Sequence, residues 1–184
     1  EYDAVCTYKE QSENMLDDDP DYPFYLTTGR VAHYHHTTLR NAPYSRELMP
    51  VPDCRINPRD AEKLGIEHGD WVRLWSRRGE TRGRAYLTEG VRPGVVMMER
   101  FYFPESYDET QKNPSGGWRQ CNVNLMARDD VVNPNFASAC WRGYRNNIEK
   151  CEKPEGIWVE PEEFQPFMPT LQSEPNTEEV FHRA

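Results

Sequence analysis

The feature that most narrowly limits the fold is one short helix set between short strands. In the stretch NPRDAEKLGI, Asn57 suits a helix N-cap, Pro58 suits the first helical position, and Gly65 suits the residue that ends the helix. A helix over 58–64 is shorter than the crossover of about a dozen residues that parallel neighbouring strands usually need. The pattern therefore argues against a sheet built from βαβ units.

Strands are predicted on both sides of this helix. FYLTTGR and DCRIN precede it, and HGDWVRLWSRRGETRGRAYLTEG follows as two strands around a turn at Gly79. Val72 and Leu74 alternate with charged neighbours, as do Ala85 and Leu87, which is typical of strands with one buried face. RPGVVMMERFYF is a further strand. Short strands joined by tight turns, with this single short helix, predict a mainly β fold that closes into a small barrel.

The two ends of the chain differ in composition from its middle. Residues 1–22 end in DDDPDYP, which predicts an N-terminal arm or linker ahead of a barrel domain over 23–151. Residues 152–184 are rich in proline and glutamate, which disfavours a packed helix, yet they contain several aromatic residues. We expect an extended C-terminal arm that straps a neighbouring domain or subunit.

Charge and cysteine content argue against several functional classes. The net charge of −9 disfavours a nucleic-acid partner. No apolar run approaches the roughly 20 residues of a membrane span, so direct membrane insertion is not expected. The five cysteines form no CxxC pair, which disfavours an iron–sulfur cluster or structural zinc within this chain. No nucleophile–base signature or Walker loop is present, and the start at Glu1 suggests a piece of a longer protein.

The loop TTGRVAHYHHTTLRNAPYSREL gathers histidines and arginines in an otherwise acidic chain. On a strand, His33 and His35 would share one face and His36 the other, and no carboxylate or cysteine stands near them in sequence to complete a metal site. Arg30 and Arg40 offer planar, fork-shaped donors that suit phosphate or carbonyl oxygens. A cradle for an anion is therefore favoured over a metal site.

Three blocks of the sequence together resemble one known family. CRINPRDAEKLGIEHGDWVRLWSRRGETRGRAYLTEGVRPGVVMM is similar to the C-terminal dinucleotide-binding domain of the molybdopterin oxidoreductases, the dimethyl sulfoxide reductase superfamily. Upstream, LTTGRVAHYHHTTLRNAPYSREL resembles the cofactor loop of that family, in which T-G-R is followed by H-T or H-S and then Arg. Downstream, FYFPE, NVNLM and NPNFASACWRGYRNNIEK resemble the closing segment. The blocks stand in the family order and cover roughly residues 23–150.

The resemblance implies a six-stranded double-psi β-barrel and a set of cofactor-binding residues. Gly29 would permit a positive φ and a close approach of the backbone. Family members often have one aromatic residue before the His-Thr step, so both His35 and His36 are candidates here, with His36 favoured. Asn122 and Asn124 are both candidates for the pterin amide edge. The full set of expected cofactor-binding residues is Thr28, Gly29, Arg30, His36, Thr37, Arg40, Asn122, Asn124 and Arg142.

The function implied is that of a domain that holds the guanine dinucleotide of a molybdopterin cofactor. In the family the ligand of the molybdenum or tungsten comes from an earlier domain, so this chain would not be catalytic alone. Its partners would be the remaining domains of the catalytic subunit and an iron–sulfur electron-transfer subunit. The sequence is nearest the branch of thiosulfate and polysulfide reductases, acetylene hydratase and catechol dehydroxylases. The alternative is a non-enzymatic double-psi barrel of the kind that recognises substrates for AAA ATPases, which has no use for the T-G-R and H-T loop.

Overall fold

The computed structural model describes Glu13 and residues 19–36, 38–39, 42–49, 51–99, 120–132, 139–140 and 142–154 of the chain. The strands in this part are β1 (Phe24–Gly29), β2 (Asp53–Ile56), β3 (Trp71–Trp75), β4 (Glu80–Leu87), β5 (Val95–Glu99), β6 (Arg128–Val132), β7 (Ala139–Cys140) and β8 (Tyr144–Lys150). The helices are α1 (Pro43–Leu48), α2 (Pro58–Leu64) and the 3-10 helix η2 (Val123–Met126).

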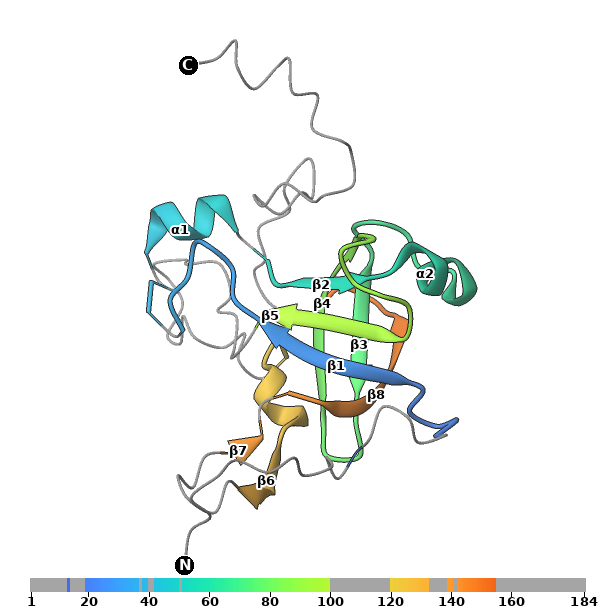
Figure 1. Cartoon of the computed structure of the whole chain (residues 1–184). Coiled ribbons are helices and arrows are strands. Elements are labelled where there is room, and N and C mark those ends of the chain that lie inside the picture. The colour runs from blue at the N-terminus through green and yellow to red at the C-terminus, as the bar shows by residue number, and fades with distance from the viewer. Residues whose placement is uncertain are drawn as a thin grey trace, which may run out of the picture.

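Six strands form a closed barrel in the order β1-β5-β2-β4-β3-β8, with β8 pairing back to β1 (Figure 1). The pairs β1–β5 and β2–β4 are parallel, while the other four neighbouring pairs are antiparallel. Strands β6 and β7 pair only with each other in a separate two-stranded sheet. The predicted closed, mainly β barrel is confirmed, and so is the helix expected over 58–64.

Helix α2 is held by the residues that predicted it. The Asn57 side chain accepts a hydrogen bond from the Arg59 N–H at 3.0 Å and donates to the Val91 carbonyl at 2.7 Å. Gly65 ends the helix with φ at +65°, a conformation that glycine adopts without strain. The buried carboxylate of Asp60 accepts from the Gly94 N–H at 2.6 Å, which ties the helix to the turn before β5.

The barrel is filled by alternate residues of its strands, as the periodicity predicted. Val72 and Leu74 are fully buried, and so are Ala85 and Leu26. A second, smaller apolar cluster lies outside this core. Trp71 belongs to it, because it precedes the inward-facing Val72 on β3 and so faces the other way. That second cluster consists of Val31, Tyr34, Met49, Val51, Trp71 and Cys121. It fixes the segment between β1 and β2 against the barrel wall.

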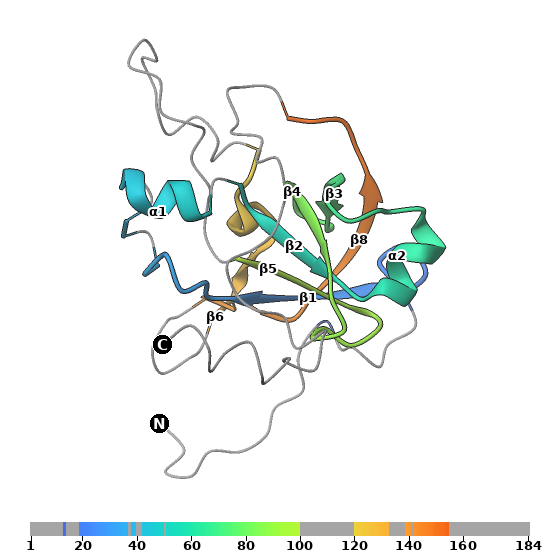
Figure 2. The same cartoon turned by 90° about the horizontal axis from the view of Figure 1, so that it is seen from above.

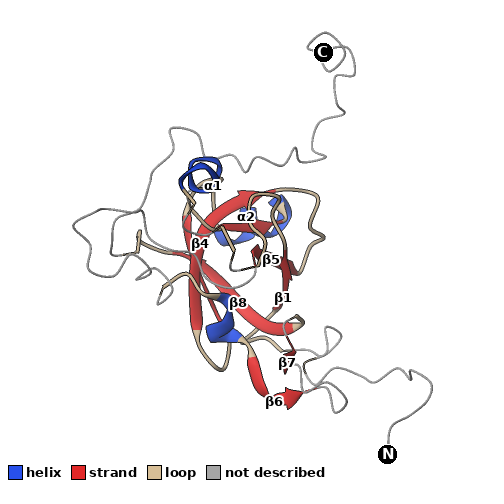
Figure 3. Ribbon diagram, turned by 90° about the vertical axis from the view of Figure 1, so that its left-hand side faces the viewer, coloured by secondary structure: helices blue, strands red, loops and turns tan. Residues whose placement is uncertain are grey.

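The structure adds two helices that the sequence did not predict. Helix α1 begins after Ala42, which makes no side-chain hydrogen bond to it, so it lacks the usual N-cap signal. Helix η2 is a single 3-10 turn. Figures 1 and 2 both show α1 and η2 at the end of the barrel to which β1 and β5 point, and α2 at the opposite end. Seen from the first of these ends (Figure 3), α1 lies above and η2 below.

The predicted arms over 1–22 and 152–184 lie mostly outside the described residues, so the boundaries of the barrel domain stay predictions. The described part of the first arm contacts the barrel: Asp19 pairs with Arg77 at 2.6 Å, and Asn147 donates to the Asp21 carbonyl at 3.1 Å. In the part of the chain that the structure describes, no helix has the length and apolar character of a membrane span.

Candidate functional site

The last residues of β1 lead into the loop that was predicted from the sequence to bind the cofactor. Thr28 is only 4% exposed, and it shares the inward face of the strand with Leu26. Gly29 does not adopt the positive φ that we expected, since the described glycines with positive φ are Gly65, Gly69, Gly94 and Gly143. A Cβ on Gly29 would lie 1.8 Å from the Met97 methyl carbon. Within the described structure, the space beside Gly29 is therefore filled by a neighbouring strand.

Arg30 and His36 meet across this loop. An Arg30 guanidinium nitrogen lies 2.8 Å from His36 Nε2, and this contact is exposed to solvent. Because arginine can only donate, Nε2 must accept, which requires the imidazole to be neutral with its proton on Nδ1. His35 does not make this contact, and its ring packs edge-on against that of His36 at 4.9 Å. The backbone groups of His35 and Thr38 bond to each other at 2.9 and 3.4 Å and close the turn.

The backbone between Arg30 and α1 is strained at two residues. His36 has φ at +56° and Leu39 has φ at +71°, both in the left-handed region that side chains disfavour. Such conformations gather at functional sites and persist only where the surroundings hold them. Thr37 and Arg40, the other two residues expected in this loop, lie outside the described residues.

The closing segment separates the two asparagine candidates. The side-chain oxygen of Asn122 accepts a hydrogen bond from the Asn124 N–H at 3.1 Å and so caps η2. Asn124 itself is exposed on η2. Helix η2 is attached to the β3–β4 connection, where Ser76 Oγ donates to the Met126 carbonyl at 3.3 Å and Arg78 Nε donates to the same oxygen at 2.9 Å.

The cations of the closing run also differ from each other. Arg142 is exposed and lies just before β8, where the Gly143 N–H donates to the Leu26 carbonyl at 2.9 Å. Arg145 is 5% exposed, and its guanidinium donates to the Pro23 carbonyl at 3.4 Å. Pairing of β8 with β1 therefore brings the exposed Arg142, and not Arg145, to the end of the barrel that carries Arg30.

Glu13 is a residue of this region that sequence reasoning missed. Its carboxylate accepts from the Arg78 guanidinium and from the Arg145 N–H, the latter at 2.6 Å. Burial alone would raise the pKa of Glu13, but these hydrogen bonds and the charges of Arg78 and Arg128 outweigh burial, so the pKa is lowered. Arg145 is 132 residues away along the chain, and no local pattern marks Glu13 as its partner.

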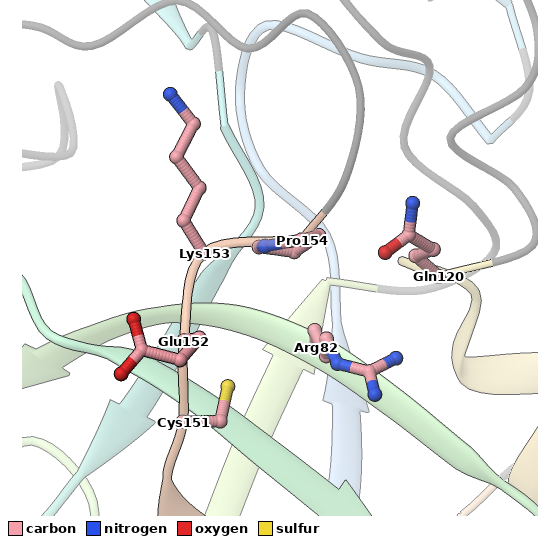
Figure 4. Close-up of a pocket in the computed structure, with 6 residues that line it drawn as sticks. All are labelled: Arg82, Gln120, Cys151, Glu152, Lys153 and Pro154. Atoms are coloured by element: carbon pink, nitrogen blue, oxygen red, sulfur yellow. The ribbon is translucent and has the colours of Figure 1, made fainter.

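A cavity of about 380 Å³ lies on the flank of the barrel (Figure 4). Its described lining consists of Arg82, Gln120, Cys151, Glu152, Lys153 and Pro154. Arg82 is paired with Glu80 at 2.8 Å. Burial raises the pKa of the Cys151 thiol, although the charges of Arg82 and Arg73 act in the opposite direction. None of the predicted cofactor residues belongs to this described lining. Among the described residues, no cluster of three or more His, Cys, Asp or Glu side chains could hold a metal ion.

Comparison with known proteins identifies the family. The model of the molydopterin dinucleotide binding domain matches residues 24–134, well over half of the chain. The chain belongs to this family of molybdopterin dinucleotide-binding domains. The match begins at β1 and ends beyond η2, so it includes both the Arg30 loop and the asparagines of the closing segment.

The relatives of this dinucleotide-binding domain are much longer proteins. The chain is 35% identical over 148 residues to a dopamine dehydroxylase of Eggerthella lenta, an alignment that covers 78% of this chain and 14% of that protein. It is 48% identical over 90 residues to the alpha subunit of an F420-dependent formate dehydrogenase of Methanocaldococcus jannaschii, covering 48% of this chain and 13% of the relative. The chain thus spans about one seventh of these relatives, 14% and 13% of their lengths.

A solved structure shares the fold. Acetylene hydratase from Pelobacter acetylenicus superposes with a TM-score of 0.70 at 20% sequence identity, over 82% of this chain and 22% of that one. At this identity the likeness concerns the fold alone. Together with the family match, it supports the double-psi barrel that the resemblance implied.

The exposed residues at this end of the barrel fit an anionic dinucleotide. Arg30 and Arg142 are exposed cations carrying several N–H donors each, and Asn124 presents an exposed carboxamide. Thr28 and Asn122 fit less well, because the first is buried in β1 and the side-chain oxygen of the second caps η2. The described donor set is thus cationic and amide-like, which suits phosphate oxygens and the edges of planar rings.

Proposed function

We propose that this chain holds the guanine dinucleotide part of the molybdopterin cofactor within the catalytic subunit of a molybdenum- or tungsten-dependent oxidoreductase. The observation that carries the proposal is the exposed Arg30–His36 pair at the end of β1, inside the family match. The exposed Arg142 adds a second cation, because it precedes β8, which begins at the same end of the barrel. The alternative is a non-enzymatic barrel that recognises substrates for AAA ATPases. It is less favoured because such a function gives no role to the exposed Arg30 and Arg142.

Each residue has a distinct task in this proposal. Arg30 would donate to phosphate or carbonyl oxygens, with His36 holding one of its nitrogens so that the planar guanidinium keeps one orientation. Arg142 would meet a second anionic group. The exposed Asn124 carboxamide would pair with the amide edge of the pterin, whose donor and acceptor it can match. Thr37 and Arg40 are proposed for the same cradle, and so are Thr28, Gly29 and Asn122.

The chain would bind and orient the cofactor without performing chemistry alone. When bound, the metal and pterin supply the two-electron oxidation or reduction. We infer that the metal ligand comes from another part of the catalytic subunit, that this chain holds no iron–sulfur cluster, and that a separate iron–sulfur subunit exchanges electrons with it. The relatives act on substrates as different as dopamine and formate, as their names state. We therefore infer that substrate choice is made outside this domain.

Loss of the Arg30 guanidinium tests the proposal. In the full-length subunit, Arg30→Ala removes a charge-assisted contact worth about 1.5–3 kcal/mol, which is about a ten- to hundredfold loss of cofactor affinity. Arg30→Lys should restore only part of the binding, because it keeps the charge and loses the planar fork. The measurement is the molybdopterin and guanine nucleotide released per mole of purified subunit.

The matched control is Arg59→Ala. Arg59 is also exposed, but it lies on α2 at the opposite end of the barrel. Its variant should retain the wild-type cofactor content. Equal pterin content in wild type, Arg30→Ala and Arg142→Ala would rule out the cradle.

A further inference from the structure

Large apolar side chains are exposed at one place more than elsewhere. The described large hydrophobic residues with high exposure are Leu39 (39%), Tyr44 (59%), Leu48 (45%) and Leu125 (38%). The first three belong to α1 and the turn before it. Tyr44 and Leu48 are four residues apart and so lie on the same side of the helix. We refer to Leu39, Tyr44 and Leu48 as the α1 apolar face.

The other side of α1 is firmly packed. Ser45 and Met49 are almost completely buried, and the Tyr34 hydroxyl donates to the Met49 carbonyl at 2.7 Å and lies 3.3 Å from that of Ser45. The helix is therefore fixed to the barrel by one side. The exposure of its other side is not caused by detachment of the helix from the barrel. A six-residue helix is far below the length that is stable by itself. Its position is thus set by packing, which presents the α1 apolar face in one orientation.

The backbone of Leu39 gives a second indication. Its φ of +71° is unfavourable for a residue with a branched side chain, by about 1–2 kcal/mol. Strain of this kind persists where surrounding contacts hold it. Leu39 is nevertheless 39% exposed, so the described structure covers it only in part. A surface packed over the leucine side chain would supply the missing contacts.

We propose that the α1 apolar face packs against an apolar surface of the remaining part of the catalytic subunit. This rests on the proposed function only in that the chain is one domain of such a subunit. The chain spans 14% of a dehydroxylase relative, so most of the subunit is available to cover the face. The face is also continuous with the candidate cofactor loop, because Leu39 lies between His36 and α1 along the chain. Figures 1 and 2 show α1 at the end of the barrel to which β1 points.

Docking at this face would fix the cofactor loop from its far side. The loop is anchored at one end by β1, which precedes Arg30, and at the other by α1. The strained residues His36 and Leu39 lie between these anchors. A surface that holds Leu39 and α1 would also hold the turn that carries His36, and through it the Arg30 guanidinium. The rest of the subunit would thereby position a contact to the cofactor without touching the cofactor itself.

Thiol accessibility in the full-length subunit tests this proposal. Leu48→Cys should react with a maleimide at least about tenfold more slowly than Lys63→Cys, since labelling at a covered site waits for local opening. Lys63 is the control because its side chain is 74% exposed on α2, at the other end of the barrel. Modification is read by mass spectrometry of the peptide that carries the new cysteine. Tyr44→Cys, at the most exposed position, is the second variant, so a folding failure of Leu48→Cys leaves the test intact.

Each outcome decides between the possible occupants. Labelling of Leu48→Cys and Tyr44→Cys as fast as Lys63→Cys means that the face is open to solvent and overturns the proposal. Protection that disappears on dilution, together with dissociation of a dimer, assigns the face to a second copy and also overturns it. Protection that is independent of concentration supports docking within the subunit. Pterin content measured on Arg30→Ala reports on the cofactor cradle separately, because it does not depend on the labelling rates.

Discussion

The two ends of the barrel are held in different ways. At the α2 end, each position with a particular structural requirement is occupied by a residue that meets it. Asn57 caps the helix, Gly65 takes the left-handed conformation, and Asp60 accepts a hydrogen bond from the Gly94 N–H. At the α1 end, left-handed conformations fall on His36 and Leu39, and Ala42 offers no side-chain cap. The first end satisfies its requirements with nearby residues. The second end keeps cations and apolar side chains exposed, which is what a surface for a ligand and a neighbouring domain requires.

The largest effect on stability is expected at Asn57. Asn57→Ala removes the helix cap, worth about 1–2 kcal/mol, and the buried hydrogen bond to Val91, worth about 1 kcal/mol more. Urea unfolding of the chain should show this loss in the free energy of unfolding. Asn124→Ala, at an exposed asparagine of the other end, should change that free energy by less than about 0.5 kcal/mol. Equal losses for the two variants would contradict the contrast between the ends.

Replacing the glycine at position 65 and introducing a glycine at position 39, two of the positions with positive φ, should affect stability differently. Gly65→Ala should cost about 1 kcal/mol, because its φ of +65° is unfavourable for alanine although no atom lies within 4 Å of the added Cβ. Leu39→Gly should be neutral or slightly stabilising in the isolated chain, since relief of strain offsets the entropy of the added glycine. Thermal unfolding of the two variants measures both. A clear loss of stability for Leu39→Gly would mean that Leu39 is already held within this chain.

The smallest effect concerns Glu13, which links the N-terminal arm to the α1 end through Arg78 and η2. Its pKa is lowered by folding, so its contribution to stability is present above the unfolded pKa of about 4.5. That contribution is lost as the pH falls through the folded-state pKa. Glu13→Gln should therefore lower the free energy of unfolding at pH 7. As the pH falls from 7 to 3, the variant should lose less of this free energy than the wild type does, as measured by unfolding at each pH. An unchanged acid profile would place the stabilising carboxylate elsewhere.

Local signals were enough to predict the α2 half of the fold. Asn57, Pro58 and Gly65 act on neighbours within a few residues, and the alternation at Val72 and Leu74 reports directly on a buried face. The inward position of Thr28 could have been predicted in the same way, since it is two residues from Leu26 on β1. The six-stranded double-psi barrel was predicted from the family resemblance and not from local pattern, and the order of its strands comes from the structure.

The candidate site was predictable in part, for a physical reason. Arg30 and His36 stand six residues apart, and their loop was recognised, but the strain at Leu39 has no sequence signal because leucine does not favour a positive φ. The hydrogen bond from the Arg145 N–H to the Glu13 carboxylate joins residues 132 positions apart, so no local pattern predicts it. Asn122 was predicted to contact the pterin, and its role as the cap of η2 follows only from the structure. Thr37 and Arg40 stay predictions.

Closure of the barrel has a consequence for how such a domain is exchanged between enzymes. Each of its six strands has a hydrogen-bonded neighbour on both sides, so the barrel offers no open strand edge on which another polypeptide could continue the sheet. Any neighbour must recognise it through side chains and loops. Contacts of that kind can change one residue at a time without shifting a strand register. A closed barrel can therefore be carried between subunits of different chemistry while its interior stays the same.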